Sequence, residues 1–173
     1  KEHYLEHLRR NLALTDNDAL RRQLLQVADL GFLDQDNCRA AVDLLLRAPQ
    51  NAALLGDAEG LRPRPAEEIL TEMLTAARRY DAPEAAIGAV RASRRSELLR
   101  LAMADLLGEL DLPGLGRALS DLAGATIDAA LEVASRGVDV PPIAVIAMGR
   151  WGGREVSYSS DADAMFVVAD SDS

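Results

Sequence analysis

The stretch that decides the fold is MGRWGGREVSYSSDADAMFVV, residues 148–168, close to the end of the 173-residue sequence. An apolar run, IAVIAMG, leads into it, and a second run, ADAMFVVA, closes it. Short continuous apolar runs bounded by proline, glycine or turn residues are typical of buried strands. The stretch therefore predicts two buried strands, Ile143–Gly149 and Ala162–Ala169, joined by a glycine elbow and an acidic segment.

The sequence before these strands is helical in character. Apolar residues recur at helical spacing between residues 15 and 48, and Ala66–Tyr80 begins with two glutamates, which favour a helix start. The longest helical run covers 81–110, with Asp81 and Pro83 in starting positions, and another begins at 112 and is expected to end at Gly137. We therefore expect a mostly α protein, in which a multi-helix body is followed by the first two strands of an α+β domain.

Composition and charge limit the class of protein. Apolar residues make up 49% of the sequence, which suits a packed core, and the net charge of −9 argues against a nucleic-acid binder. The single cysteine, Cys38, is compatible with the cytoplasm, and no run approaches the roughly 18 apolar residues of a membrane span. We expect neither a nucleic-acid nor a membrane partner. Because the sequence opens on Lys1 without a methionine, we also expect it to be a fragment of a longer protein.

Asp161 and Asp163 stand two residues apart at the start of the second predicted strand. Side chains two apart in a strand share a face, so the two carboxylates are expected to lie side by side. Two like charges that close repel each other unless a cation lies between them, and a pair of carboxylates is a usual way of holding Mg²⁺. The alternative is a solvated turn, in which Asp-x-Asp is common.

Gly152 and Gly153 directly follow the first predicted strand. Without Cβ atoms, their backbone N–H groups can approach a phosphate closely. Together with Ser160 and the aspartates, they would present donors and a metal to one triphosphate. A plain tight turn remains the alternative for each glycine. The sequence has no Gly-Lys-Ser/Thr, which excludes a P-loop.

Three other features have simpler interpretations. His3 and His7 are four residues apart but lack a third metal ligand, so we interpret them as an incidental pair. The arginines between 91 and 100 are interpreted as a solvated or salt-bridged helix face, with a docking surface for an acidic partner as the alternative. Trp151 either stacks on a base or fills the space between strand and helix.

The stretch resembles the nucleotidyltransferase signature of glutamine synthetase adenylyltransferases, within the DNA polymerase beta-like superfamily. In that family, an apolar strand is followed by Met-Gly-(Lys/Arg)-x-Gly-Gly-x-Glu, a spacer, Ser-Asp-x-Asp and a second apolar strand. The residues that match are Met148, Gly149, Arg150, Gly152, Gly153, Glu155, Ser160, Asp161 and Asp163. The segments 44–57, 89–108 and 112–131 resemble the helices that precede the signature, so the resemblance covers nearly the whole chain.

The resemblance implies an enzyme that transfers AMP from ATP to a tyrosine of glutamine synthetase, in cytoplasmic regulation of nitrogen assimilation. It implies Mg²⁺ bound by Asp161 and Asp163, the catalytic residues, and phosphates bound by Gly152, Gly153 and Ser160. A PII-type nitrogen signalling protein is implied as a second partner. The family is bifunctional, and its second half removes AMP by phosphorolysis. The segment 44–65 favours the adenylylating half.

The family's third metal-binding carboxylate lies on a later strand, which this sequence does not reach. Asp170 and Asp172 are too near in sequence to replace it and are interpreted as a solvated tail. We therefore predict a helical region at 1–109 and the N-terminal part of a truncated nucleotidyltransferase domain at 110–173, inactive by itself. The alternatives are the adenylyl-removing half and a non-catalytic helical docking or regulatory fragment.

Overall fold

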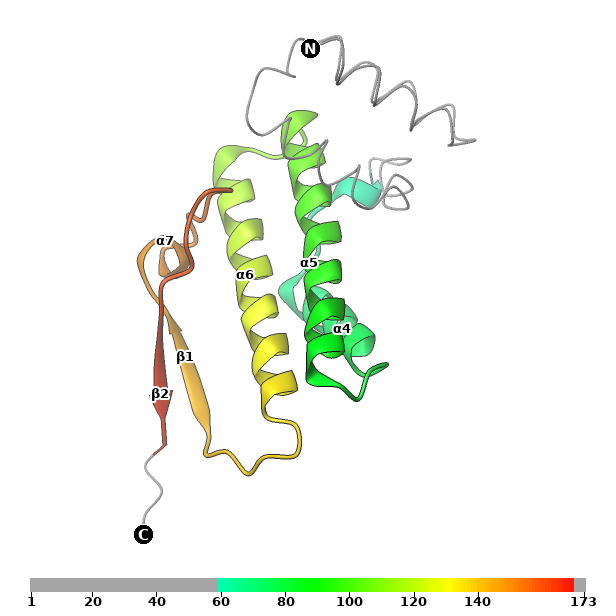
Figure 1. The fold of residues 1–173 in the computed structure, drawn as a ribbon. Coiled ribbons are helices and arrows are strands. Elements are labelled where there is room, and N and C mark those ends of the chain that lie inside the picture. Colours follow the sequence, from blue (N-terminus) through cyan, green and yellow to red (C-terminus); the bar gives the residue numbers. More distant parts are fainter. Residues whose placement is uncertain (1–58, 170–173) are drawn as a thin grey trace. The chain divides into compact units, whose positions relative to one another are not determined.

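The computed structural model describes residues 59–169. The predictions for the helices between 15 and 48, and for Lys1, His3, His7, Cys38, Asp170 and Asp172, lie outside these residues. Figure 1 shows the described elements in chain order: η3 (Glu59–Leu61), α4 (Ala66–Ala77), α5 (Pro83–Leu106), α6 (Leu112–Ala134), β1 (Ile143–Ala147), α7 (Gly149–Gly152) and β2 (Ala164–Val168).

The chain divides into two compact units, and α5 contributes to both. Of the described residues, the first unit contains 59–63 and 95–111. Its part of α5 buries Leu99, Leu101, Ala102, Met103 and Ala104 together with Glu97, and the Glu97 carboxylate pairs with Arg100 at 3.3 Å. The second unit contains 64–94 and 112–169, and it holds every predicted site residue.

Helices α4 and α6 pack against each other in the second unit. Helix α4 begins directly after Pro65, and its buried residues Ile69, Met73 and Ala77 are spaced four apart, which places them on one face. Helix α6 buries the following residues: Leu115, Gly116, Ala118, Leu119, Ser120, Leu122, Ala125, Ala129 and Val133. The predicted helices at 66–80 and 112–137 are therefore confirmed, with the same first residues and with each helix ending three residues earlier.

A side chain that follows α6 ties the two helices together at one end. Nη1 of Arg136 donates to the carbonyl oxygens of Ala77 and Tyr80, at 3.4 and 3.2 Å. These carbonyls lie at the C-terminal end of α4, where a helix leaves its last acceptors without an internal donor and where positive charge is favourable. The contact therefore fixes the end of α4 against the residues that lead into the sheet.

Strands β1 and β2 form a two-stranded antiparallel sheet. Ile143 is opposite Val168 and Ala147 is opposite Ala164, and the pairing extends beyond both ends. At one end the Met148 N–H donates to the Asp163 oxygen, and at the other the Ala169 N–H donates to Pro142, both at 2.9 Å. The two predicted strands and the fold class are confirmed.

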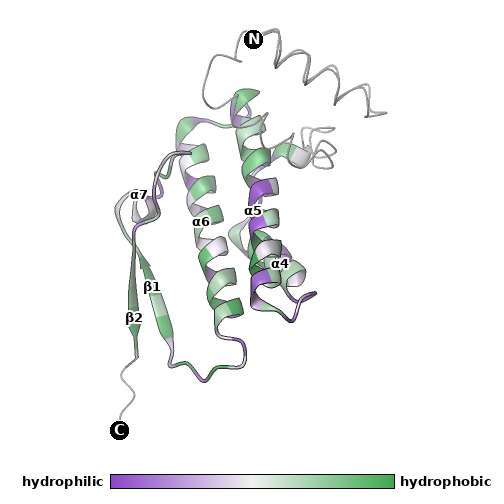
Figure 2. Ribbon diagram, in the orientation of Figure 1, coloured by the Kyte–Doolittle hydropathy of each residue, from purple (hydrophilic) through white to green (hydrophobic). Residues whose placement is uncertain are grey.

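The prediction that these strands are buried is wrong for the described part of the chain. Figure 2 shows a hairpin that is hydrophobic along both strands. Its exposed large apolar side chains are Ile143, Ile146, Met148, Met165, Phe166, Val167 and Val168. The hairpin is only two strands wide, and within residues 59–169 no second layer covers its faces, so apolar side chains on both faces contact solvent. Within the same residues, no helix combines the length and the apolarity needed to cross a membrane.

Candidate functional site: the glycine elbow and the two aspartates

The glycine elbow is a single turn of helix, α7, placed between the end of β1 and the loop that leads to β2. The Gly152 and Gly153 N–H groups donate to the carbonyls of Met148 and Gly149, at 2.9 and 3.0 Å. A Cβ on Gly152 would lie 2.6 Å from the Ala147 oxygen, whereas one on Gly153 would meet nothing closer than 3.5 Å. Gly152 is thus required by the close approach of the turn to β1, and Gly153 leaves room for a side chain or a ligand.

Trp151 anchors the elbow to α6. Its side chain is buried, and its Nε1–H donates to the carbonyl of Ser120 at 3.1 Å. The indole also lies against Gly124, where an added Cβ would meet its Cζ2 at 3.9 Å. Of the two interpretations of Trp151, the structure supports the one in which it fills the space between strand and helix.

The loop after the elbow crosses α6 at a second small residue, Gly116. A Cβ on Gly116 would lie 3.1 Å from the Arg154 carbonyl oxygen and 3.3 Å from Cα of Glu155. Gly116, Ser120 and Gly124 are spaced four apart, so they form one stripe along α6. The absence of large side chains on this stripe lets the elbow and its loop lie directly against the helix.

Arg154 adds an ion pair to this contact. Its Nη2 lies 2.9 Å from the carboxylate oxygens of Asp121, a residue of α6. In the sequence, Arg154 occupies a variable position of the family motif, and no pattern there indicates a role for Asp121. The spacing of small residues at 116, 120 and 124 is the one sequence signal that indicates a close contact on this face of α6.

Asp161 and Asp163 both lie just before β2, and both are exposed. Neither carboxylate forms an ion pair or a hydrogen bond within the described residues. Asp163 lies against the elbow: a Cβ on Gly149 would come 2.6 Å from its Oδ2, and Gly149 has a φ of +52°. A residue with a side chain at 149 would therefore be strained and would also push the Asp163 carboxylate away.

Ser160 lies in a small polar network within the loop. Its Oγ accepts from the Ser157 N–H at 2.9 Å, lies 2.8 Å from the Ser157 hydroxyl oxygen, and accepts from Nη1 of Arg150 at 3.3 Å. Arg150 belongs to α7 and is exposed. The structure thus brings Arg150 of the elbow to the predicted phosphate-binding serine. From the sequence, this arginine was only a match to the family motif.

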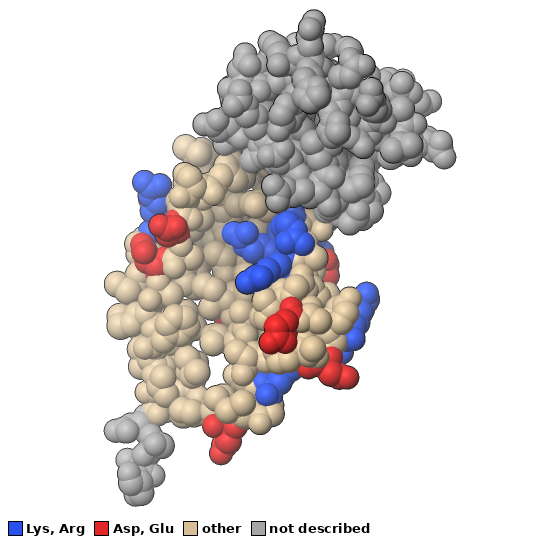
Figure 3. All heavy atoms as spheres, in the orientation of Figure 1, with Lys and Arg blue, Asp and Glu red and all other residues tan. Residues whose placement is uncertain are grey.

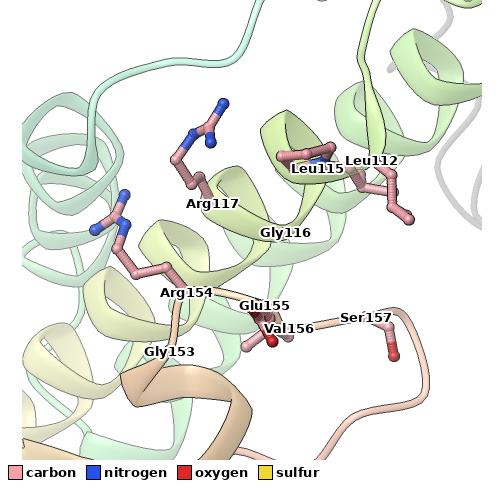
Figure 4. A pocket seen from close by; sticks show the side chains of 10 residues that line it. Leu112, Leu115, Gly116, Arg117, Gly153, Arg154, Glu155, Val156 and Ser157 are labelled. Atoms are coloured by element: carbon pink, nitrogen blue, oxygen red, sulfur yellow. The ribbon is translucent and has the colours of Figure 1, made fainter.

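A cavity of about 630 Å³ opens beside the elbow, between the first turns of α6 and the loop. The residues that line it are Leu112, Pro113, Leu115, Gly116, Arg117, Gly153, Arg154, Glu155, Val156 and Ser157. Figure 4 shows that the Arg117 and Arg154 side chains extend to the same side, away from Leu112 and Ser157. Gly153 is therefore the one predicted site residue that borders this cavity.

The predicted metal ligands form a pair at most in the described part of the chain. Across residues 59–169 the structure gathers no group of three acidic, histidine or cysteine side chains that could hold a metal ion. Two exposed carboxylates suit Mg²⁺, which usually keeps several waters and takes one or two protein carboxylates. The bare Cα of Gly149 makes room for the Asp163 carboxylate itself, since an added Cβ would lie 2.6 Å from its Oδ2.

The arginines of α5 take no part in this site. Arg91, Arg94 and Arg95 are exposed, and Figure 3 shows basic side chains gathered over the middle of the helix. Arg100, in contrast, is buried with Glu97. The interpretation as a solvated and partly salt-bridged face therefore agrees with the structure.

Comparison with known proteins adds a family to this geometry. Residues 38–173 match the family described as glutamate-ammonia ligase adenylyltransferase. The chain is also similar to proteins named bifunctional glutamine synthetase adenylyltransferase/adenylyl-removing enzyme. The protein of that name from Cutibacterium acnes is 46% identical over 159 residues, which cover 91% of this chain and 15% of the relative.

Two further relatives carry the same name. The Nocardia farcinica protein is 46% identical over 136 residues, which cover 72% of this chain and 13% of the relative. The Streptomyces coelicolor protein is 43% identical over 173 residues, which cover 89% of this chain and 17% of the relative. This chain thus spans roughly a sixth of the length of the curated relatives it matches.

Proposed function

The chain belongs to the glutamate-ammonia ligase adenylyltransferase family, and from this premise we propose that residues 143–169 carry the nucleotide site of an adenylyltransferase half. Its reaction would move AMP from ATP to a tyrosine of glutamine synthetase. The observation that carries the proposal is the position of Asp163, whose unpaired carboxylate lies against Gly149 of the elbow. An acidic group and a glycine turn from two chain segments thus meet at one end of the hairpin.

The proposed metal ligands are Asp161 and Asp163, with Mg²⁺ as the ion. When bound, the ion would neutralise negative charge on the triphosphate. The two carboxylates are exposed and unpaired in the described residues, so no internal cation competes for them. Their role is to hold the ion beside the elbow, and the family's third carboxylate would come from beyond this chain.

The proposed phosphate contacts are Gly152, Gly153 and Ser160, and we add Arg150. Because the two glycine N–H groups already donate within the turn, these glycines would serve by leaving space rather than by donating. The Ser160 hydroxyl and the Arg150 guanidinium lie together and would supply the donors. Arginine suits phosphate because its planar group presents several N–H donors to the oxygens.

The chain's residues bind and orient rather than react. The tyrosine hydroxyl oxygen of the partner would attack the α-phosphorus of ATP, lose its proton and displace pyrophosphate, which leaves AMP on the tyrosine. Such transfers depend mostly on positioning and charge neutralisation. No nucleophile is needed from this chain.

The adenylyl-removing reaction is the second candidate, because the relatives' names include both activities. There inorganic phosphate would attack the phosphorus of the adenylyl-tyrosine, releasing ADP and the free tyrosine. The two are separable in the full-length protein by substrate. Unmodified glutamine synthetase with ATP tests transfer, and adenylylated glutamine synthetase with phosphate tests removal. A cytoplasmic location and a PII-type signalling partner stay predictions that rest on the family resemblance.

Titration of ATP into the full-length protein, with and without Mg²⁺, tests the nucleotide site. We expect the Asp161→Asn/Asp163→Asn double variant to lose one class of Mg²⁺-dependent ATP sites, while Asp139→Asn, which changes an exposed aspartate of the linker before β1, keeps it. Unchanged ATP stoichiometry and affinity in the double variant would favour a helical docking or regulatory role for this segment instead.

A further inference from the structure

Arg154 has a backbone conformation that is unusual for its residue type. Its φ is +58°, and within residues 59–169 it is the only non-glycine residue with a positive φ. The others are Gly108, Gly137 and Gly149. A side chain makes this left-handed conformation unfavourable, so it persists where the surrounding structure holds it, commonly at functional sites.

The backbone hydrogen bonds at this position do not require an arginine. The Arg154 N–H donates to Trp151 at 3.0 Å, and the Glu155 N–H donates to Arg150 at 2.8 Å. This is the Schellman pattern that ends helices, and its left-handed residue is usually glycine. At the end of α5, Gly108 occupies the same place in the same pattern, with distances of 3.0 and 2.8 Å. Glycine would therefore serve the elbow's backbone as well, or better.

What the arginine adds is the ion pair with Asp121. The two residues are 33 positions apart, and the pair joins the end of the elbow to the middle of α6. The side chains are 52% and 27% exposed, and ion pairs of that kind contribute little to stability. Stability therefore does not account for an arginine in a strained conformation, whereas the direction that the pair imposes on the elbow does.

The elbow's direction matters because Asp163 lies against its first residue. The Met148 N–H donates to the Asp163 carbonyl at 2.9 Å, and Oδ2 of Asp163 occupies the space beside the bare Cα of Gly149. A rotation of α7 on α6 would therefore change how Gly149 and this carboxylate lie against each other. Trp151 anchors one side of the turn, and Arg154 anchors its end.

We infer that Arg154 is a positioning residue, which acts through its ion pair with Asp121. The pair holds the elbow at the angle at which Asp163 and the phosphate contacts bind the same nucleotide. The inference rests on the proposed function of the hairpin. If it holds, loss of the ion pair lowers kcat and leaves the stability of the fold unchanged.

Steady-state kinetics of the full-length enzyme test this expectation. The activity to measure is the one, transfer or removal, that depends on Asp163. We expect Arg154→Gly and Asp121→Asn each to lower kcat by about tenfold or more, since small displacements of reacting groups are costly. The KM for glutamine synthetase should not change. The thermal midpoint of Arg154→Gly should equal or exceed that of the wild type, because glycine relieves the left-handed conformation.

A charge swap supplies the rescue. Arg154→Asp combined with Asp121→Arg restores the pair with its ends exchanged, and aspartate tolerates the left-handed conformation better than most residues. We expect this double variant to recover most of the kcat lost in Arg154→Asp alone. Arg79→Ala, which removes an exposed arginine after α4, is the control and should keep the wild-type kcat.

Two results would overturn the inference: a wild-type kcat in Arg154→Gly, or no recovery in the charge swap. Asp163→Asn, assayed alongside, separates this failure from that of the proposed function. If Asp163→Asn is inactive while Arg154→Gly is fully active, only the positioning role is lost. If Asp163→Asn retains both activities of the wild type, the proposed function itself fails.

Discussion

At the scale of single residues, the two central glycines have different reasons to be glycine. Gly152 lies so close to β1 that an added Cβ would meet the Ala147 oxygen at 2.6 Å. Gly153 has ordinary space around it and a φ of −77°, which any residue adopts. The sequence alone could not separate them, because the same doublet is compatible with a turn and with a phosphate site.

We predict that Gly152→Ala destabilises the chain by about 1–3 kcal/mol, the usual cost of forcing an extra group into a packed site. Gly153→Ala should leave stability within about 0.5 kcal/mol of the wild type, as for most substitutions without a steric conflict. Urea unfolding of the 173-residue chain measures both. Gly88→Ala, in α5 with nothing within 4 Å of the added Cβ, is the control for a Cβ without a steric conflict and should stabilise the chain by roughly 0.5–1 kcal/mol, because alanine is favoured over glycine inside a helix.

The ligand role of Gly153 is tested separately. If phosphates approach it closely, Gly153→Val in the full-length protein weakens ATP binding, because a branched side chain would occupy the phosphates' place. Isothermal titration with ATP and Mg²⁺ provides the measurement. Equal affinity in the variant and the wild type would mean that Gly153 serves only the turn.

Trp151 carries a prediction of its own. Trp151→Phe removes the indole N–H that donates to Ser120 and leaves part of the buried space empty. We expect a loss of roughly 1–3 kcal/mol, which combines a hydrogen bond with a small cavity. Denaturant unfolding measures it, and a wild-type midpoint would show that the anchor to α6 is dispensable.

At the scale of elements, the sequence predicted the helices and strands well and their environment less well. The ends of α4, α6, β1 and β2 lie within about three residues of the expected positions, because proline, glycine and acidic residues mark them. The apolar runs 143–149 and 162–169 predicted burial, since such runs suit strands covered on both faces. Nothing in a strand's own residues reveals which segment covers it, so the exposed hairpin was unexpected.

The exposed hairpin predicts self-association of the chain when it is isolated. Apolar faces and unpaired strand edges favour pairing with another copy. Phe166 and Val168 are 56% and 52% exposed and, being two apart in β2, share a face. We expect light scattering after gel filtration to show dimers or larger species, and Phe166→Glu/Val168→Glu to shift the population toward monomer. A wild-type chain that stays monomeric at all concentrations would contradict this.

At the scale of the whole molecule, the described residues form two units, and the proposed nucleotide site lies within one of them. The sequence predicted the family from the motif at 148–163 and a division at 109/110, which stays a prediction. The ion pair between Asp121 and Arg154 could not be predicted, because 33 positions separate the two residues and only the fold brings them together. The spacing of the aspartates indicated a metal pair, and within residues 59–169 no third acidic, histidine or cysteine side chain joins them.

For the 173-residue chain alone, we predict weak Mg²⁺-dependent nucleotide binding at best and no sustained AMP transfer. A metal site short of one carboxylate positions the triphosphate poorly, and transfer depends on that positioning. Labelled ATP incubated with the chain and glutamine synthetase measures the activity. Repeated turnover would mean that these residues hold a complete active site.

The central claim, that Asp161 and Asp163 form the metal-binding part of an adenylyl-transfer site, is tested most directly by Asp163→Asn in the full-length protein. AMP transfer to glutamine synthetase and its phosphate-dependent removal are measured separately, with Asp139→Asn as the control. The account predicts that Asp163→Asn lowers the transfer rate by roughly 100-fold or more, as loss of one electrostatic stabiliser commonly does, with an unchanged thermal midpoint. Removal should stay at the wild-type rate. Transfer at the wild-type rate in Asp163→Asn would contradict the account.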